Sequence, residues 1–530
     1  MSFKIPALIF LQICASVAGA QTINAASCNQ SDVQNAFNSI TSSTTTVNIP
    51  AGTCTWNSTV TLTQPTGSTS LTIQGQTTCT GDGNPANNNL ACTDSTLIND
   101  GMSYTSADPP LLSVTTLAGA SFRMTGLTFN GTGSLQTYNG AINIYGGSQA
   151  VRVDHNHIEN IHNTPLNTGA GIAGVYDHNI WYNNPSSVLF HITGASGSDW
   201  SGNIPWSQPT ALGTSNFVFF EDNLIQGGGN DCDHGGRFVV RYNTFVNNGN
   251  VLQYILTHPT GEPGGAIRGC RAWEVYGNAM INNNYAYMPQ IFFIDTGTGV
   301  DWGNVVSGSD TTNNYFEFLN VRSNSNTYTQ VPTPNGWGNC GTAFSGTGSA
   351  WDQTSNTPSG YRCIDQLGSG QGDLLTVGGN FPTIVDTVTG KISYPNEALE
   401  PVYSWMDTFP GGGAFVNNQE PTVIHANQDY YLWCDPNSTT GCTSFNGTVG
   451  VGSGPLASRP STCTTGVAYW ATDQGNWNQS GIGGRGELFN CTSTNTWTLF
   501  YTPYTYPHPL VTGNAAAVNP PTGLTGTVVQ

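Results

Sequence analysis

The side chains that could do chemistry are rare in this chain of 530 residues, and they lie close together. Only 8% of the residues are charged, whereas about 25% is usual in soluble domains. Seven of the nine histidines lie between residues 155 and 258, and four of the ten arginines lie between residues 237 and 271. Imidazoles act as general acids and bases near neutral pH, and guanidinium groups hold carboxylates through paired hydrogen bonds. A purely structural protein has no need of this concentration, which therefore favours a functional site in the middle of the chain.

The rest of the composition excludes several classes of protein. The chain has 12 Lys and Arg against 31 Asp and Glu, for a net charge of −19. We expect no nucleic-acid partner, because phosphate binding needs clustered basic residues. Aromatic residues make up 11% of the chain, which is enough to build a core and argues against disorder. After the N-terminus, no apolar run approaches the length of about 18 residues that a membrane span needs.

Residues 1–20 have the features of a secretory signal peptide. Lys4 supplies a positive charge, residues 5–15 are mostly apolar, and Ala18-Gly19-Ala20 forms a small-residue cleavage motif before Gln21. We therefore predict a secreted protein, extracellular or periplasmic, with no membrane attachment after signal cleavage. A short membrane anchor is the alternative.

The cysteines support export. Cys14 lies in the predicted signal peptide, and the other twelve form an even set, as expected for disulfides in an oxidising compartment. A metal site built from cysteines is disfavoured, because the chain has no C-x-x-C pair and no Cys/His cluster with zinc spacing. We predict that neighbours along the chain pair: Cys28 with Cys54, Cys79 with Cys92, Cys232 with Cys270, Cys340 with Cys363, Cys434 with Cys442, and Cys463 with Cys491.

A repeat built around an asparagine organises the middle of the chain. The aligned segments are VRVDHNHIENI, GVYDHNIWYNN, VFFEDNLIQGG, VVRYNTFVNN and WEVYGNAMINN, with the asparagines Asn156, Asn179, Asn223, Asn243 and Asn278. Apolar residues flank each asparagine in strand-like alternation. Asparagine tolerates the left-handed backbone of a tight corner, and stacked amides could bond to one another. We predict a parallel β-helix, in which each repeat buries its apolar face by stacking on its neighbours.

The flanking segments complete the predicted layout. Residues 30–40 are expected to form a helix that caps the first repeat, because an exposed terminal strand is a site of aggregation. The predicted parts are residues 21–120 as N-terminal cap and first repeats, 121–320 as the central β-helix with its cleft, 321–455 as later repeats and long loops, 456–510 as a cysteine-bridged C-terminal cap or small carbohydrate-binding module, and 511–530 as a disordered tail.

The stretch NIPAGTCTWNSTVTL…LTIQG and the asparagine repeats resemble the pectate-lyase-like family of right-handed β-helix proteins, over about residues 28–320. Val153-Asp154-His155-Asn156 resembles the Asp-His element of its lyases, whereas their Arg-x-Pro-x-x-Arg stretch is absent. The resemblance implies an all-β fold, a right-handed parallel β-helix (solenoid) with an N-terminal cap helix and an irregular, disulfide-bridged C-terminal region. It also implies a secreted protein that acts on a polysaccharide.

In this family the substrate cleft lies along the strand before each asparagine corner strand, together with nearby loops. Carried over by register, that strand is expected at residues 141–146, 188–193, 230–235, 251–258 and 290–295. Neighbouring strands lie about 4.8 Å apart, so their polar side chains are expected to form a row. The members of the row are Tyr145, His191, Asp231, Asp233, His234, His258 and Asp295.

The chemistry that fits this row best is β-elimination on a uronic acid polymer, so we expect a polysaccharide lyase. A cation must neutralise the substrate carboxylate, a base must remove the adjacent carbon-bound proton, and an acid must assist the leaving oxygen. We assign neutralisation to Arg268 and Arg271, with Arg237 in support, and the base to His258. His234 is a candidate acid.

The remaining expectations concern substrate and metal binding. Asp231 and Asp233 could hold Ca²⁺, as the corresponding strand does in calcium-dependent lyases, and their spacing puts both carboxylates on one strand face. The predicted Cys232–Cys270 bridge would fix an arginine cluster beside this acidic strand. The residues predicted to bind substrate are Arg237, Arg241, Tyr242, His191 and Asp295, with Tyr242 as a second candidate acid.

Several alternatives stay open. Arg237 and Arg241 could pair with Glu221 or Asp222 on the surface, and His155 and His178 could stack without binding a metal. The chain could be a glycoside hydrolase that uses two of Asp231, Asp233 and Asp295 as acid and base. It could also be a non-catalytic carbohydrate binder or adhesin. A neutral glycan becomes the better substrate if no basic cleft forms, since a protein of charge −19 repels polyanions. We expect a monomer.

Overall fold

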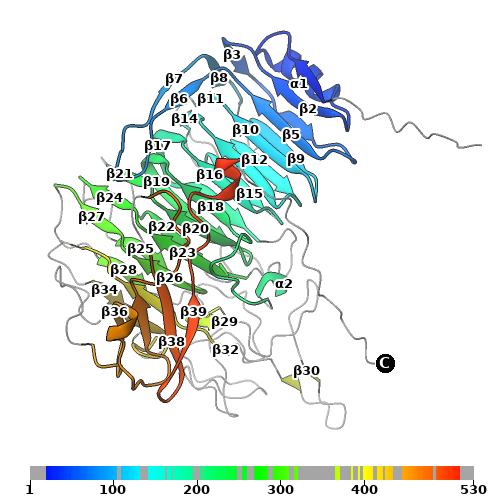
Figure 1. The fold of residues 1–530 in the computed structure, drawn as a ribbon. Coiled ribbons are helices and arrows are strands. Elements are labelled where there is room, and N and C mark those ends of the chain that lie inside the picture. Colours follow the sequence, from blue (N-terminus) through cyan, green and yellow to red (C-terminus); the bar gives the residue numbers. More distant parts are fainter. Residues whose placement is uncertain are drawn as a thin grey trace, which may run out of the picture.

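The computed structural model describes residues 20–103, 109–131, 141–161, 164–169, 171–194, 203–206, 208–247, 253–258, 268–283, 290–309, 315–319, 365–370, 384–385, 392–393, 398–409, 415–419, 421, 424–433, 445–481 and 485–513. The described part is almost entirely β-structure, with two long parallel sheets that run through the molecule (Figure 1). Most of the predicted signal peptide, including Cys14, lies outside the described residues. Most of the predicted tail also lies outside them, as do Cys340, Cys363, Cys434 and Cys442.

The first long sheet has twelve strands, and every pairing in it is parallel. Its strands in order are β1 (Gln21–Asn24), β2 (Thr44–Asn48), β5 (Ser70–Gln74), β10 (Ser121–Thr125), β13 (Ala150–Asp154), β16 (Gly174–Asp177), β18 (Val218–Glu221), β20 (Arg237–Arg241), β23 (Ala272–Tyr276), β26 (Thr298–Trp302), β33 (Val402–Trp405) and β35 (Tyr430–Leu432).

The second long sheet has seventeen strands. They are β3 (Gly52–Trp56), β4 (Val60–Thr63), β8 (Thr96–Asp100), β9 (Leu112–Thr116), β11 (Thr128–Asn130), β12 (Ile142–Gly146), β14 (His157–Glu159), β15 (Leu166–Gly169), β17 (Ile180–Thr193), β19 (Leu224–Asp233), β21 (Thr244–Asn247), β22 (Ile255–Thr257), β24 (Ala279–Asn282), β25 (Gln290–Ile294), β27 (Val305–Ser307), β28 (Tyr315–Leu319) and β34 (Val416–Asn418).

Consecutive strands of the chain alternate between the two sheets. β10 belongs to the first sheet, β11 and β12 belong to the second, and β13 returns to the first beside β10. The residues three places before each repeat asparagine therefore fall in register, as the alignment predicted: Val153, Tyr176, Phe220, Val240 and Val275. Parallel sheets are buried because each face needs cover, and here the two sheets bury their facing sides against each other.

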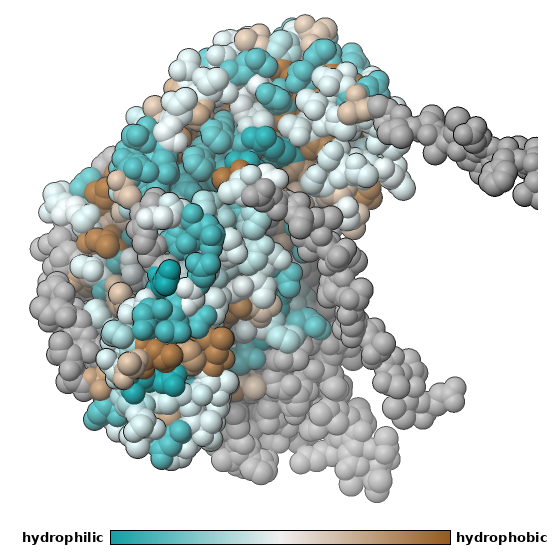
Figure 2. All heavy atoms as spheres, in the orientation of Figure 1, coloured by the Kyte–Doolittle hydropathy of each residue, from teal (hydrophilic) through white to brown (hydrophobic). Residues whose placement is uncertain are grey.

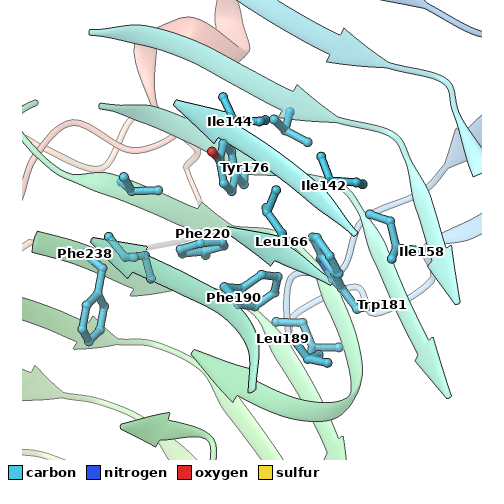
Figure 3. Close-up of a cluster of buried hydrophobic side chains, with 14 of the residues drawn as sticks. Ile142, Ile144, Ile158, Leu166, Tyr176, Trp181, Leu189, Phe190, Phe220 and Phe238 are labelled. Carbon is cyan, nitrogen blue, oxygen red and sulfur yellow. The ribbon is translucent and has the colours of Figure 1, made fainter. Parts of the chain in front are cut away.

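The core between the sheets is apolar and aromatic (Figure 3). The Phe190 ring lies between Trp181 and Phe220, with ring centroids 4.4 Å and 4.3 Å away. Ile142 and Ile144 of β12 alternate with outward-facing residues, as a strand with one buried face must. The face shown in Figure 2 is mainly hydrophilic, with hydrophobic residues in small separate patches.

The repeat asparagines form a continuous ladder, as predicted. Each side-chain amide donates to the Oδ1 atom of the next repeat's asparagine, for example Asn223 to Asn243 at 2.9 Å and Asn243 to Asn278 at 3.1 Å. The same Oδ1 atoms also accept backbone N–H groups, so these buried amides are well satisfied. The ladder is longer than the alignment indicated, because Asn304 and Asp407 continue it.

The prediction that these asparagines take the left-handed backbone is wrong. The left-handed residue is the one before each asparagine, and the φ angles are 54° at His155, 54° at His178, 59° at Asp222 and 56° at Tyr242. The next two repeats have glycine there. Side chains with a Cβ atom rarely adopt this conformation, at a cost of roughly 1–2 kcal/mol per residue. The cost is tolerated because the turn directs the next side chain, the asparagine, into the ladder.

The predicted N-terminal helix packs against the first strands of the structure. The helix α1 (Gln30–Asn38) is confirmed and buries Val33, Ala36 and Phe37 against the first strands.

Four predicted disulfides are confirmed: Cys28–Cys54, Cys79–Cys92, Cys232–Cys270 and Cys463–Cys491. The Cys79–Cys92 bridge joins a two-stranded hairpin, β6 (Thr78–Thr80) and β7 (Ala91–Thr93). None of the helices in the described part is long and apolar enough to cross a membrane.

The C-terminal segment packs against the outward face of the twelve-stranded sheet. Its own small sheet contains β36 (Val451–Gly454), β37 (Ala468–Ala471), β38 (Glu487–Ser493) and β39 (Thr496–Tyr501). The Trp302 ring of β26 lies 4.9 Å from Trp470 and 5.8 Å from Trp477. These rings are buried in the contact, so they are not available to stack on a sugar.

Short elements complete the structure. The end of the C-terminal segment reaches α3 (Pro509–Thr512), which packs against β13 and β16 (Figure 1). The other short elements are α2 (Asn203–Trp206), the 3₁₀ helix η3 (Leu456–Ser458), and two two-stranded antiparallel sheets, made by β29 (Ser369–Gly370) with β32 (Ala398–Leu399) and by β30 (Ile384–Val385) with β31 (Ile392–Ser393).

The asparagine ladder gives a direct stability prediction. Asn243→Ala removes the Oδ1 acceptor of Asn223 and the amide that bonds to Asn278, all at buried positions. Because unsatisfied buried polar groups cost about 1–3 kcal/mol each, we expect the free energy of unfolding to fall by about 2–5 kcal/mol in urea denaturation. The control is Asn24→Ala, whose bond to Asn48 is exposed and whose effect should stay below about 0.5 kcal/mol. Equal losses in the two variants would contradict a stabilising ladder.

Candidate active site

Three imidazoles and two carboxylates come together at the outward face of the seventeen-stranded sheet. β17 and β19 pair in parallel with His191 opposite Asp231 and Thr193 opposite Asp233. The residues between them, Ile192 and Cys232, belong to the core. Strand alternation therefore places His191, Asp231 and Asp233 on the outside, as the predicted row requires.

Asp233 is held between two histidines. Its Oδ2 lies 3.0 Å from Nε2 of His191, and its Oδ1 lies 2.5 Å from Nδ1 of His234. His234 follows β19 with a left-handed φ of 51°, and its backbone N–H bonds to the Arg268 carbonyl. The two side chains are only partly exposed, 23% for His191 and 19% for His234, so the contacts with Asp233 are weakly screened by solvent.

These contacts decide the charges of the group. Burial alone would lower the pKa of His191, but the Asp233 carboxylate outweighs burial and raises the pKa to about 9. Burial works in the opposite sense at Asp233, and the two imidazoles overcome it and hold the pKa of that carboxyl well below its usual range. His191 and Asp233 are therefore a charged pair at neutral pH.

A second pair lies on the next strand. His258 directly follows β22, and its Nδ1 atom lies 2.7 Å from Oδ2 of Asp231. The backbone of His258 bonds to the Cys232 carbonyl and to the Cys270 N–H, so the Cys232–Cys270 bridge holds its strand in place. A carboxylate on Nδ1 fixes the ring and its tautomer, and Nε2 becomes the basic nitrogen of a neutral imidazole.

Tyr145 and two asparagines extend the row on the N-terminal side. Burial and the Asp233 carboxylate raise the pKa of Tyr145, so its hydroxyl keeps its proton. Asn143 and Asn167 share a register row with His191. Each is buried, and its Oδ1 atom has no hydrogen-bond partner in the described part of the chain.

The predicted row left out one strand. β15 lies between β12 and β17, so Tyr145 is two strands from His191 and not beside it. The sequence of β15, LNTG, is short and poor in residues typical of strands. Its Gly169 is needed, because a Cβ there would lie 2.5 Å from the Tyr145 ring and 2.6 Å from Oγ1 of Thr193. Only the strand spacing of the neighbouring repeats could have indicated this strand.

A pocket opens at the end of this row. Its volume is about 210 Å³, and Thr193, Gly235 and Arg237 are among its lining residues. The guanidinium of Arg237 donates to the carbonyls of Pro205 and Pro209, and its buried Nε atom has no hydrogen-bond partner among the residues that the structure describes. Burial and the nearby Arg271 lower the pKa of Arg237 to about 10. An anion in the pocket would relieve this unfavourable burial of charge.

Two of the predicted catalytic arginines do not face the row. Arg268 is fully buried and pairs with Asp365, with Nε 2.7 Å from the carboxylate. Arg271 is also fully buried, lies 2.8 Å from Glu400, and shares the Trp206 ring with Arg268. The assignment of these arginines to a substrate carboxylate is therefore corrected, because each guanidinium is already committed to a carboxylate of the protein. They support the backbone that carries His234 and His258.

Arg241 and Tyr242 are engaged by the C-terminal segment, which corrects their assignment to substrate binding. Arg241 belongs to the twelve-stranded sheet, pairs with Glu221 at 2.6 Å, and donates to Tyr504 and Thr505 of the C-terminal segment. Pairing with Glu221 was the alternative left open, although the pair is buried and not on the surface. The Tyr242 ring packs 4.1 Å from that of Tyr506.

Two further expectations are settled by geometry. The His155 and His178 rings stack with centroids 5.1 Å apart, so the expected stacking of these two side chains is confirmed. Asp295 follows β25 and is buried next to Thr257, to which its backbone N–H donates. Asp295 therefore lies at the end of the predicted strand, but its side chain is more buried than those of the other members of the row.

The residues predicted to hold Ca²⁺ do not fit that ion. Asp231 accepts the Cys232 N–H on Oδ1 and pairs with His258 through Oδ2, while both oxygens of Asp233 face imidazoles. Calcium takes roughly six to eight oxygen ligands, and carboxylates engaged by histidines in this way do not supply them. No step of the chemistry is therefore assigned to Ca²⁺.

Comparison with known proteins found no matching family model, no matching curated protein and no matching solved structure. The function must therefore be inferred from the geometry of the site.

The His191–Asp233 pair predicts a specific pH dependence of stability. A histidine whose pKa rises from 6.5 to about 9 on folding adds stability that is complete below pH 6.5 and is lost as the pH rises through 9. His191→Gln should therefore lower the free energy of unfolding by about 2–3 kcal/mol at pH 6, and the difference from wild type should shrink towards pH 9. Urea denaturation at pH 6, 7.5 and 9 measures it. A difference that is constant over this range would exclude the charged pair.

Proposed function

We propose that this chain is a secreted right-handed parallel β-helix protein that cleaves a uronic-acid-containing polysaccharide by β-elimination. Strands that alternate between two parallel sheets favour the β-helix, and crossovers between parallel strands are right-handed in about 98% of cases. Disulfides in the described part favour an oxidising compartment. The single observation that carries the function is the pair of adjacent His–Asp contacts on the outward face, beside a pocket lined by Arg237.

The proposed chemistry uses His258 as the base. Its ring is fixed by Asp231 through Nδ1, so Nε2 would remove the proton from C5 of the uronate. The electron pair forms the C4–C5 double bond, and the C4–oxygen bond to the leaving sugar breaks. The leaving oxygen takes a proton from an acid, for which the protonated His191 and the Tyr145 hydroxyl are the candidates.

The carboxylate of the sugar also needs a positive partner, since its negative charge otherwise opposes loss of the C5 proton. Arg237 takes this role in the revised assignment, because it is the arginine that lines the pocket at the end of the row. A local basic site is required here because the chain as a whole carries a charge of −19 and repels polyanions at long range.

A glycoside hydrolase is the second candidate, favoured by the placement of Asp231 and Asp233 on one strand face. Residues i and i+2 of a strand are separated by roughly 6.6 Å, near the lower limit for inverting glycosidases. One of the two must then act as a protonated acid, whereas the imidazoles around Asp233 keep it ionised. The products distinguish the candidates, since a lyase yields an unsaturated sugar and a hydrolase yields a saturated reducing end.

The first test is ultraviolet absorbance of unsaturated products over a panel of uronic acid polymers. His258→Gln should lower kcat by about 10²–10⁴-fold, the usual contribution of a positioned base. The control is His157→Gln on β14, where the imidazole lies 3.0 Å from Asp94, and it should retain full activity. Reducing ends without absorbance would support the hydrolase instead, and neither signal on any polymer would support a binding protein.

The second test concerns Arg237. Arg237→Met should raise KM for the uronate polymer by about tenfold or more, because a hydrogen bond to a charged group contributes about 1.5–3 kcal/mol. Arg237→Lys keeps the positive charge but lacks the paired N–H donors, so its KM should lie between those of the wild type and Arg237→Met. Steady-state kinetics, with a thermal melt of each variant, separates binding from folding effects. An unchanged KM in a folded Arg237→Met variant would remove Arg237 from the site.

A further inference from the structure

A second group of titratable side chains lies away from the proposed active site, where three distant parts of the chain meet. Asp82, His178 and Asp222 each offer one ligand atom, and these atoms all lie within 4.8 Å of one another. Asp82 is in the loop between β6 and β7, and the other two occupy successive left-handed corners of the asparagine repeat. The β6–β7 loop therefore reaches across to the stacked repeats.

The backbone is shaped for this approach. The Gly83 N–H donates to the Asp222 carbonyl at 3.1 Å. A Cβ on Gly83 would lie 2.3 Å from the backbone carbonyl carbon of Asn223, so only glycine lets the loop come this close. The contact places Asp82 beside the two corner residues.

His178 is oriented by a carboxylate that is not part of the group. Its Nδ1 atom lies 2.9 Å from Oδ2 of Asp177, and Arg152 holds the same Asp177 through Nε and a terminal nitrogen at 2.9 and 2.8 Å. This is the arrangement that fixes the ring and tautomer of metal-binding histidines and leaves Nε2 for the ion.

Asp222 is a buried carboxylate with spare capacity. It is 3% exposed, and its Oδ1 accepts hydrogen bonds from Asn84 and Tyr506. No donor in the described part of the chain reaches its Oδ2. Asp222 can therefore accept a further partner on the side that faces Asp82 and His178.

We propose that Asp82, His178 and Asp222 bind a divalent transition-metal ion of the zinc class. Two carboxylates and an imidazole suit Zn²⁺ better than Ca²⁺, which prefers oxygen ligands alone. The ion would tie the β6–β7 loop to the corners of the repeats. Through the Tyr506 hydroxyl on Asp222, it would also secure the C-terminal segment. The site is separate from the proposed catalytic row, and a water molecule would complete the tetrahedral coordination of Zn²⁺ by the three side chains.

The test uses the full chain and Zn²⁺ alone. After removal of metal with a chelator and dialysis, isothermal titration with Zn²⁺ and elemental analysis of the loaded protein should show one ion at this site, and Zn²⁺ should raise Tm. Asp82→Asn and Asp222→Asn should weaken Zn²⁺ binding at least tenfold and abolish the rise in Tm. Asp222→Asn keeps the oxygen that accepts from Asn84 and Tyr506, and asparagine tolerates the left-handed φ of 59° there. Asp82→Asn keeps an acceptor for the Asn84 N–H and loses only the exposed bond from the Asn87 side chain, so both variants should fold.

The matched control lies in another group of similar composition, Asp94, His157 and Glu159. Asp94→Asn should leave the ion and the rise in Tm unchanged. Loss of the ion in Asp94→Asn with retention in Asp82→Asn would place it in that group and overturn the proposal. Absence of Zn²⁺ binding by the wild-type chain, or full binding by both Asp82→Asn and Asp222→Asn, would overturn it as well.

Discussion

The buried asparagine ladder is the interaction on which the rest of the structure depends. Each Oδ1 atom accepts both a side-chain amide and a backbone N–H from the preceding repeat, so a repeat that slipped by one residue would bury unsatisfied polar groups. A slip by one residue would also turn every strand side chain to the opposite face. The ladder therefore fixes the register, and the register decides which side chains enter the core and which face outward.

The candidate active site follows from that register. His191 and Asp231 meet because they sit on neighbouring strands at the same level, and His258 reaches Asp231 from the strand beyond. No helix or domain interface is needed to assemble the group. The segment from Arg268 to Cys270 packs beside the ends of these strands, and its backbone hydrogen bonds hold His234 and His258 in place. The site is thus built from short local contacts on a rigid stack, which favours precise placement of catalytic groups.

The sequence was sufficient to predict the features that repeat along the chain and the contacts between residues that are close in sequence. The asparagine positions were visible because a side chain that bonds to its counterpart in the next repeat must be the same residue each time. Neighbouring cysteines pair because a short separation along the chain keeps the two sulfur atoms close, as in the β6–β7 hairpin. The sequence could not predict that Arg268 would pair with Asp365, which lies 97 residues away. It also gave no sign that histidine and tyrosine, with their Cβ atoms, would take the left-handed corner.

Arginine is rare and clustered in this chain, but its clustering along the sequence did not by itself identify the arginines of the candidate site. In a chain with so few cations, most of the described arginines neutralise carboxylates of the protein itself. The pairs are Arg123 with Asp154, Arg152 with Asp177, Arg241 with Glu221, Arg268 with Asp365 and Arg271 with Glu400. Burial explains these pairs, because an isolated buried charge costs far more than a paired one.

Arg237 differs from these arginines. Its described partners are carbonyl oxygens, and it lines a pocket. Carbonyls accept two of its hydrogen bonds without cancelling its charge, so an anionic ligand gains more at Arg237 than at an arginine that already faces a carboxylate. The functional arginine in such a protein is therefore one that forms no ion pair among the described residues, and clustering along the sequence does not reveal which one that is.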